Sequence, residues 1–215
     1  MHPDLHRSFD DTMRDRWLLD HPFYRRWEAG ELTRAELTSY AEQYGFFEAL
    51  LPAFLAALSG QLDGAARELV EANLADEVTP PSHLELFERF ARHYGARDVP
   101  ASPAMSRLLD AYASVLDRGP VCALAGLLAY ESQGAPIADS KGSGLATNYG
   151  ASEDALEFWR EHGTTEVDHA AWTFDALAAL DPDPDEVAEG ARLVGDAWWS
   201  FLDERELLRG ELTSA

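Results

Sequence analysis

The chain has 215 residues, and its content of 46% hydrophobic and 26% charged residues is typical of a folded globular protein, which excludes a disordered or fibrous chain. Its 39 acidic residues against 17 basic ones give a formal net charge of -22, which would repel a phosphate backbone and argues against nucleic acid as a partner. This length supports one core, so we expect a single domain over residues 1–215.

The sequence predicts no membrane segment. The longest stretch without a formal charge, Ala49–Leu62, is too short to cross a bilayer and contains Pro52. Met1–Asp4 lack the basic and apolar stretches of a secretory signal, and Cys122, the single cysteine, cannot form an internal disulfide. We therefore expect a cytoplasmic protein.

Helix signals dominate from the N-terminus, and the strict apolar alternation of strands is nearly absent. The pattern predicts a first helix over Leu5–Leu19, a short turn through His21–Tyr24, and a further helix over Arg25–Ala29. The fold class that follows is all-α.

Capping signals and prolines delimit the central helices. Thr33 and Glu36 have the spacing of a capping box, which begins a helix that runs to about Leu58. Another helix, Ala65–Glu77, ends before Pro80 and Pro81, because adjacent prolines remove backbone donors. The remaining predicted helices are one capped by Ser82, Met105–Leu116, a strongly apolar helix from Pro120 through Ser132, one beginning at Ser152, and Asp185–Leu208. Gly142 and Gly144 are expected to loosen the chain beyond Ser132, and the whole is expected to form a compact bundle of about seven helices.

The most informative cluster of polar residues is His162, Glu166 and His169. Spacings of four and three place their side chains on one face of a helix. Two imidazoles with a carboxylate between them suit a first-row transition metal, although the same spacing also occurs on solvated helix faces.

Glu131 extends this metal hypothesis. It follows ten uncharged residues, so its carboxylate is expected to be buried and to need an arginine, a raised pKa or a metal ion. Glu77 and His83 flank the double proline, a position typical of surface residues when considered alone. Together the candidate metal ligands are Glu77, His83, Glu131, His162, Glu166 and His169, a set that suits two metal ions in a bundle core that activate dioxygen.

Lys141 is the only lysine beside 16 arginines. It has two interpretations: a surface lysine paired with Asp139 or another acid, or a desolvated amine that acts as a nucleophile or nitrogen donor. Tyr24 lies beside an apolar stripe, where core packing is the usual role of an aromatic residue.

Four short stretches carry a resemblance to a known group of proteins. They are His21–Tyr24 with Gly30–Thr33, Asn73–Glu77 followed by His83, Tyr130–Gln133, and His162–His169. Over roughly residues 15 to 180 the sequence resembles the haem-oxygenase-like di-metal oxidases, which are related to the TenA-like and PqqC-like proteins. The resemblance implies a haem-oxygenase-like bundle, a homodimer, and two metal ions (Fe/Fe or Mn/Fe) held by the six candidate ligands, with dioxygen and an external reductant as co-substrates.

Within this group the chain is most similar to the chlamydial type of self-sacrificing 4-aminobenzoate synthase, which serves folate biosynthesis. In that family a tyrosine that matches Tyr24 is cut out of the protein to become the product. A lysine that matches Lys141 donates the amino group. Glu166 departs from the family pattern, which usually has aspartate there, and the interval from Glu77 to His83 is one residue shorter.

Two other functions are compatible with the residues. The first is an oxidase or oxygenase that acts on a diffusible small molecule, such as an amino acid or fatty acid, with Lys141 in a salt bridge. The second is a metal-free binding protein of the TenA or PqqC kind that holds a pterin, a thiamin fragment or haem.

Overall fold

The computed structural model describes the backbone of residues 3–209 and the side chains of residues 5–209. Over this range the chain forms nine α-helices, one short 3-10 helix and no strand, which confirms the predicted all-α fold. None of these helices is both long and apolar enough to cross a bilayer. The expected absence of a secretory signal concerns Met1–Asp4, part of which lies outside the described residues.

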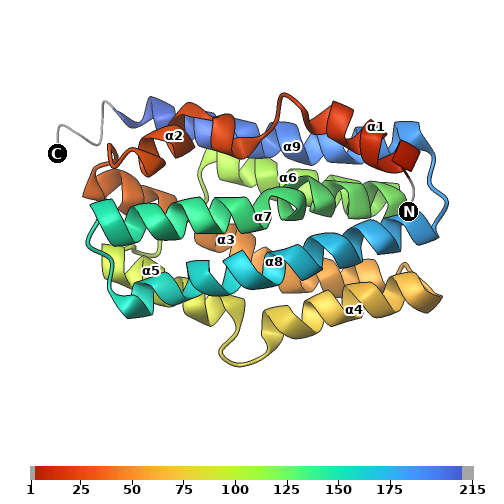
Figure 1. Ribbon diagram of the computed structural model, residues 1–215, viewed down its shortest axis with the longest axis horizontal. Coiled ribbons are helices and arrows are strands. Elements are labelled where there is room, and N and C mark those ends of the chain that lie inside the picture. The colour runs from red at the N-terminus through yellow and green to blue at the C-terminus, as the bar shows by residue number, and fades with distance from the viewer. Residues whose placement is uncertain (1–2, 210–215) are drawn as a thin grey trace.

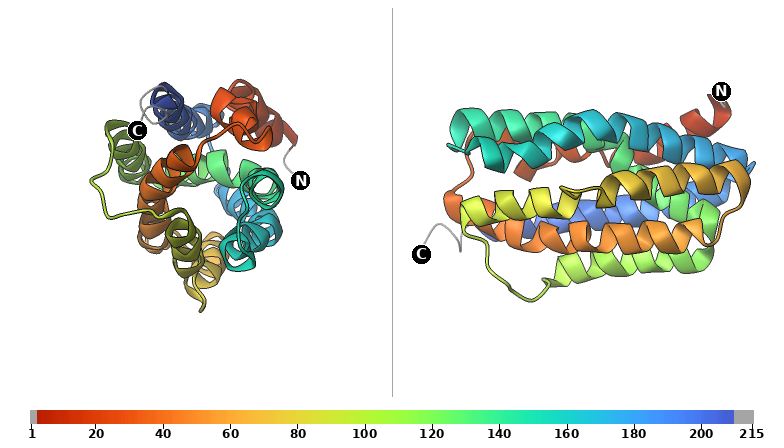
Figure 2. Two further views of the ribbon diagram at one scale, coloured as in Figure 1. Left: turned by 90° about the vertical axis from the view of Figure 1, so that its left-hand side faces the viewer. Right: turned by 90° about the horizontal axis from the view of Figure 1, so that it is seen from below.

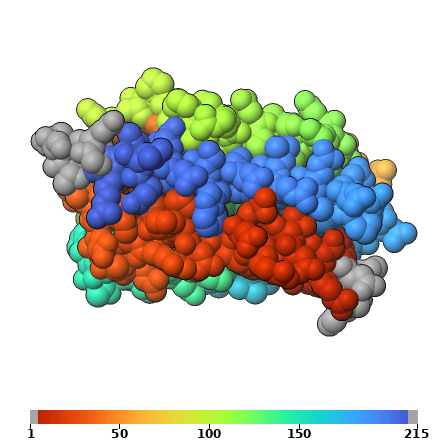
Figure 3. Space-filling view, turned by 90° about the horizontal axis from the view of Figure 1, so that it is seen from above, coloured from red at the N-terminus to blue at the C-terminus, as the bar shows by residue number. Residues whose placement is uncertain are grey.

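The helices pack lengthwise as a bundle (Figure 1). In chain order they are α1 (Pro3–Met13), η1 (Leu18–Asp20), α2 (Pro22–Glu28), α3 (Arg34–Ser59), α4 (Gly64–Val78), α5 (His83–Tyr94), α6 (Pro103–Arg118), α7 (Pro120–Asn148), α8 (Glu153–Ala179) and α9 (Pro184–Leu207). Helix α7 packs most extensively against α8 and α9, while α3, α4 and α5 close the other side (Figure 2). Helices α1, α2 and α9 cover one face of the molecule (Figure 3).

Two predicted helix starts are confirmed by their capping hydrogen bonds. Thr33 accepts from the Glu36 backbone while the Glu36 carboxylate accepts from Thr33, so the capping box that begins α3 is complete. Ser82 and Glu85 make the same reciprocal pair at the start of α5. Each box satisfies backbone donors that a helix N-terminus would otherwise leave unpaired.

The N-terminal prediction is wrong in its boundaries. The first helix ends at Met13 rather than Leu19, and a separate 3-10 turn follows. The predicted turn at His21–Tyr24 is instead the beginning of α2, in which the His21 side chain accepts from the Phe23 backbone and Pro22 is the first helical residue. Proline is favoured at that position because its fixed φ suits the first turn of a helix.

The prediction that the chain loosens after Ser132 is also wrong. Helix α7 continues without a break to Asn148, through both Gly142 and Gly144. Gly144 is a position of close packing, since a Cβ there would lie 3.0 Å from the Trp27 Cδ1 atom. A glycine inside a helix can therefore permit close packing against a neighbouring helix and does not always mark a break.

Aromatic rings in the core join α3 to α5 and α9. The Tyr44 ring centroid lies 5.3 Å from that of Tyr40, 5.2 Å from that of Phe87 and 5.8 Å from that of Trp198. These contacts tie α3 to α5 and α9 and surround the polar residues of the site with rigid, apolar walls.

The contact between α7 and α9 depends on Gly190. A Cβ at this position would lie 2.4 Å from the Cys122 carbonyl oxygen. We expect Gly190→Ala to lower the free energy of unfolding by about 1–3 kcal/mol, because the helices would have to move apart. Urea denaturation measures this change. An increase in stability, which the better helix propensity of alanine alone would give, would contradict the close approach.

Candidate active site

The six predicted metal ligands come from four helices and share one environment. Glu77 lies in the last turn of α4, His83 begins α5, Glu131 lies in the middle of α7, and the other three lie along α8. All six side chains are at most 4% exposed. The solvated-face alternative for His162 and His169 is therefore wrong.

Short distances connect these side chains. The Nδ1 atom of His169 lies 3.7 Å from Glu77 Oε1 and 3.9 Å from Glu166 Oε1. Ligand atoms of these three residues all lie within 4.8 Å of one another, close enough to share a metal ion. His83 Nδ1 is 3.0 Å from Glu77 Oε2, and His162 Nε2 is 3.7 Å from Glu166 Oε1. We call the six residues the carboxylate–imidazole cluster.

Outer contacts orient several members of the cluster. His162 Nδ1 lies 3.1 Å from the Phe158 carbonyl oxygen, which favours a proton on Nδ1 and leaves Nε2 directed toward Glu166. His169 Nε2 lies 3.5 Å from Asp76 Oδ2, and the Asn73 amide donates to Glu131 Oε1 at 2.7 Å. Metal-binding histidines and carboxylates commonly have partners of this kind, which fix the ring and its tautomer.

Burial and mutual charge shift the pKa values in the cluster. Burial, followed by the charge of Glu166, raises the pKa of Glu131 to about 7. Burial also raises the pKa of Glu166, and it lowers that of His162 well below 6.5 together with the neighbouring imidazoles. Burial alone would lower the pKa of His169, but Glu166 and the other carboxylates raise it to about 9. The fold thus holds the Glu131 and Glu166 carboxylates near each other although their negative charges repel.

Unpaired atoms in the cluster test whether a metal would fit. Among the described residues, Glu77 Oε1, Glu131 Oε2, Glu166 Oε2 and both His169 nitrogens are buried without a hydrogen bond. An unsatisfied buried polar group costs about 1–3 kcal/mol, and a bound cation would relieve several such penalties at once. Carboxylate and imidazole donors suit iron or manganese. The residues therefore fit the metal that the sequence predicts.

Lys141 is buried rather than exposed, which excludes the alternative of a surface lysine paired with Asp139 or another acid. Its side chain is 1% exposed and donates from Nζ to the Tyr40 hydroxyl at 2.5 Å. Within residues 5–209 no carboxylate forms an ion pair with it at 4.0 Å or less. Five aromatic rings with centroids 4.3–5.7 Å from Nζ form what we call the lysine cage: Tyr24, Trp27, Tyr40, Tyr44 and Trp159.

Tyr24 is the ring of the cage nearest to the amine. Its centroid is 4.3 Å from Lys141 Nζ, and its hydroxyl lies 3.0 Å from the Tyr40 hydroxyl. Burial lowers the pKa of Lys141 well below 10.5 and raises that of Tyr24, so both groups are held in their neutral forms. The structure thus brings together the two residues that sequence reasoning singled out for chemistry.

Sequence reasoning missed other residues of the site. Tyr40, Tyr44 and Glu48 follow one another at intervals of four along α3, and all three side chains are buried. The helical spacing of the two tyrosines is that of ordinary core residues, so the sequence alone does not distinguish them. The pattern that could have identified Glu48 is an acid four residues after Tyr44 and directly before the uncharged stretch Ala49–Leu62.

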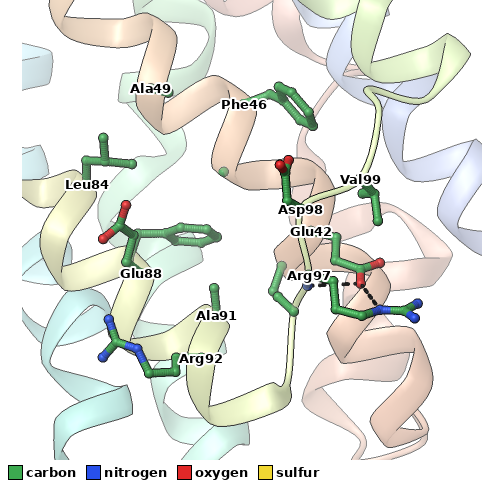
Figure 4. A pocket seen from close by; sticks show the side chains of 14 residues that line it. Glu42, Phe46, Ala49, Leu84, Glu88, Ala91, Arg92, Arg97, Asp98 and Val99 are labelled. Carbon is green, nitrogen blue, oxygen red and sulfur yellow. Dashed lines mark hydrogen bonds and ion pairs between the residues drawn. The ribbon is translucent and has the colours of Figure 1, made fainter.

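A surface groove lies apart from the cluster and the cage. Helices α3 and α5 and the segment after α5 form it, with Phe46, Leu84, Glu88 and Arg97 among the lining residues (Figure 4). None of the predicted site residues lines this groove. The buried cluster, and not this groove, holds the groups that are suited to catalysis.

Comparison with known proteins identifies the family. A sequence model described as that of iron-containing redox enzymes matches residues 38–199. The chain belongs to this haem-oxygenase-like family and is an oxidoreductase.

Relatives with assigned names support the resemblance seen in the sequence. The chain is 35% identical to a 4-aminobenzoate synthase of Nitrosomonas europaea, covering 92% of this chain and 89% of the relative. It is 29% identical to a 4-aminobenzoate synthase of Chlamydia muridarum, covering 91% and 87% respectively. The structure is similar to that of a TenA homologue from Pseudomonas syringae, with a TM-score of 0.81 and 11% identity over 95% of this chain and 93% of the other. The predicted fold and family are thereby confirmed.

Gly134 on α7 makes room for the Glu166 carboxylate. A Cβ there would lie 2.3 Å from Glu166 Oε2. We expect Gly134→Ala to push this carboxylate out of the cluster and to weaken Mn²⁺ binding by about tenfold or more. Calorimetric titration without oxygen measures the affinity. Adding Glu166→Asp, which shortens the side chain by one methylene, should restore part of it, and unchanged binding by Gly134→Ala would contradict the steric argument.

The state of Lys141 can be read from stability against pH. Because its pKa is lower in the folded protein, the unfolded chain binds one more proton between that value and 10.5. The unfolding free energy of the metal-free protein should therefore rise with pH relative to Lys141→Met, by up to about 1.4 kcal/mol per pH unit. Urea denaturation from pH 7 to 10 provides the measurement. Parallel curves for the two proteins would show that the buried amine is charged.

Proposed function

We propose that this protein is an oxygen-dependent di-metal 4-aminobenzoate synthase that makes its product from its own Tyr24, with Lys141 as the amino donor. The observation that carries the proposal is the 4.3 Å separation between Lys141 Nζ and the centroid of the Tyr24 ring. The named relatives support the same reaction. The product would serve folate biosynthesis.

The carboxylate–imidazole cluster would hold the metal ions. Its three carboxylates and three imidazoles would bind two ions, iron with iron or iron with manganese, at the atoms that now lack partners. Such ions supply the reduction of dioxygen, with electrons from an external reductant. The burial of these six side chains limits the access of bulk water to the reacting groups.

Lys141 is placed to act as a neutral amine. Burial among aromatic rings disfavours its ammonium form, and Tyr40 holds Nζ beside the Tyr24 ring. A free amine can form a bond to an electron-poor ring carbon, whereas an ammonium group has no lone pair to do so. Arginine cannot replace it, because a guanidinium stays protonated in proteins.

Tyr24 contains the carbon skeleton of the product. The ring and Cβ of a tyrosine supply all seven carbons of 4-aminobenzoate, so the Cα–Cβ bond of Tyr24 must break. Cβ is oxidised to the carboxylate. The Lys141 nitrogen forms a bond to the phenolic ring carbon, and the phenolic oxygen leaves as water. The Nζ–Cε bond of Lys141 then breaks, and Cε is oxidised to an aldehyde. Dioxygen is the oxidant. Each chain can therefore make at most one molecule of product.

Two proposals concern the assembly and setting of the enzyme. The family resemblance supports a homodimer, and the composition supports a cytoplasmic location without nucleic acid or membrane as a partner. Sedimentation in solution would test the dimer.

A nitrogen label offers a direct test, because Lys141 is the only lysine. Protein produced with lysine labelled by ¹⁵N at Nζ is loaded with Fe²⁺ and exposed to oxygen and a reductant. We expect labelled 4-aminobenzoate, at one molecule or less per chain, together with a loss of the Tyr24 side-chain mass. Both are measured by mass spectrometry.

Variants complete this experiment. Lys141→Arg and Tyr24→Phe should abolish the product, whereas Tyr94→Phe, which changes a buried tyrosine outside the cage, should not. Unlabelled product, or many turnovers with an intact Tyr24, would instead indicate a diffusible substrate. Failure of anaerobically purified protein to bind metal would indicate the metal-free binding protein.

A further inference from the structure

Glu48 is a buried carboxylate that has no ion pair among the described residues. Its side chain lies on α3 and is 1% exposed, and neither carboxylate oxygen has a hydrogen bond among the described residues. Glu36, another buried glutamate of this helix, shows the contrast because its carboxylate is fully paired. Glu36 is equally buried, but it accepts from Arg26 at 2.7 Å and from Thr33. A buried carboxylate such as that of Glu48 is stable in its charged form only with a cation or a hydrogen-bond donor beside it.

The surroundings of Glu48 show where that partner would lie. Apart from burial, the strongest influences on its pKa are the charges of Glu77 and Glu166, which raise it further. Both belong to the carboxylate–imidazole cluster. Glu48 also follows Tyr44 by one helical turn, and the Tyr44 hydroxyl contacts that of Tyr130, which precedes Glu131, so this face of α3 is directed toward the cluster. Lys141 offsets the rise in the pKa of Glu48 only in its charged form, which burial disfavours. The nearby hydroxyl of Tyr44, which also shares a hydrogen bond with Tyr130 at 2.5 Å, offsets part of this rise.

The charge of the site gives an independent argument. Two divalent ions bring four positive charges, and Glu77, Glu131 and Glu166 supply three negative ones. A net positive charge would then remain in an interior from which water is excluded, which is unfavourable. Glu48 as a fourth carboxylate makes the loaded centre neutral.

We propose that Glu48 is a seventh protein ligand of the metal centre, contributed by α3 in addition to the six residues on α4, α5, α7 and α8. This inference rests on the proposed di-metal function. It gives α3 a part in metal binding and a donor set of four carboxylates and three imidazoles, which favours iron or manganese over softer metals.

The test compares Mn²⁺ binding by the parent protein, Glu48→Gln and Glu36→Gln. Mn²⁺ is titrated without oxygen and followed by calorimetry and metal analysis. We expect two ions in the parent protein and a loss of affinity of about tenfold or more for one of them in Glu48→Gln. Glu36→Gln, a buried change in the same helix, should lose stability through its broken ion pair but bind Mn²⁺ as the parent does.

Thermal unfolding provides a second readout that does not depend on activity. Without metal, Glu48→Gln should unfold no earlier than the parent protein, because the carboxyl it replaces has no partner. Its rise in Tm on adding Mn²⁺ should be smaller. Glu48→Asp, which keeps a carboxylate, should recover part of the affinity.

The outcomes separate this inference from the proposed function. Parent-like affinity and an unchanged rise in Tm in Glu48→Gln would overturn the role of Glu48 while leaving the di-metal centre intact. A parent protein that binds no Mn²⁺ would overturn both. Two bound ions with weakened binding in Glu48→Gln, but no 4-aminobenzoate, would support the ligand and refute the synthase.

Discussion

The interior of this bundle holds ionisable groups that repel one another, and the rest of the structure is arranged around that constraint. Buried carboxylates from α4, α7 and α8 lie among three imidazoles, and several of their atoms have no hydrogen bond in the described residues. Such an arrangement opposes folding unless something else holds the helices together. Here the aromatic core and the close contact of α7 with α9 provide that support. Helix packing therefore maintains the cluster.

The site combines two environments that would be incompatible if they were mixed. The carboxylate–imidazole cluster is polar and attracts cations, whereas the lysine cage is aromatic and drives a proton off its amine. Shared helices connect them: α7 carries Glu131 and Lys141, and α8 carries both Trp159 and His162. Ten residues of α7 separate the first two by about 15 Å along the helix axis. Rigid helices thus fix the spacing between the cluster and the cage without a mobile loop.

Much of the fold and part of the site were predictable from local signals. Capping boxes at Thr33 and Ser82 and the spacing of His162 and His169 are encoded over a few residues, so a single sequence reveals them. The aromatic residues of the cage were not predictable in this way, because their spacing is the same as that of ordinary core residues. Gly134 and Glu48 depend on side chains that approach from other helices. Their roles became visible only from tertiary contacts.

Helix α2 is short, and its hold on the bundle affects the stability of a chain that has already reacted. This helix has seven residues, and it is held to the bundle by a few buried rings, Tyr24 among them. Under the proposed reaction, the ring that leaves as product is also one of its anchors. Losing a buried aromatic side chain typically costs about 3–5 kcal/mol, a large share of the stability of an ordinary domain. A chain that has reacted would thus become an easier target for proteases than a fresh one, which would clear spent protein from the cell.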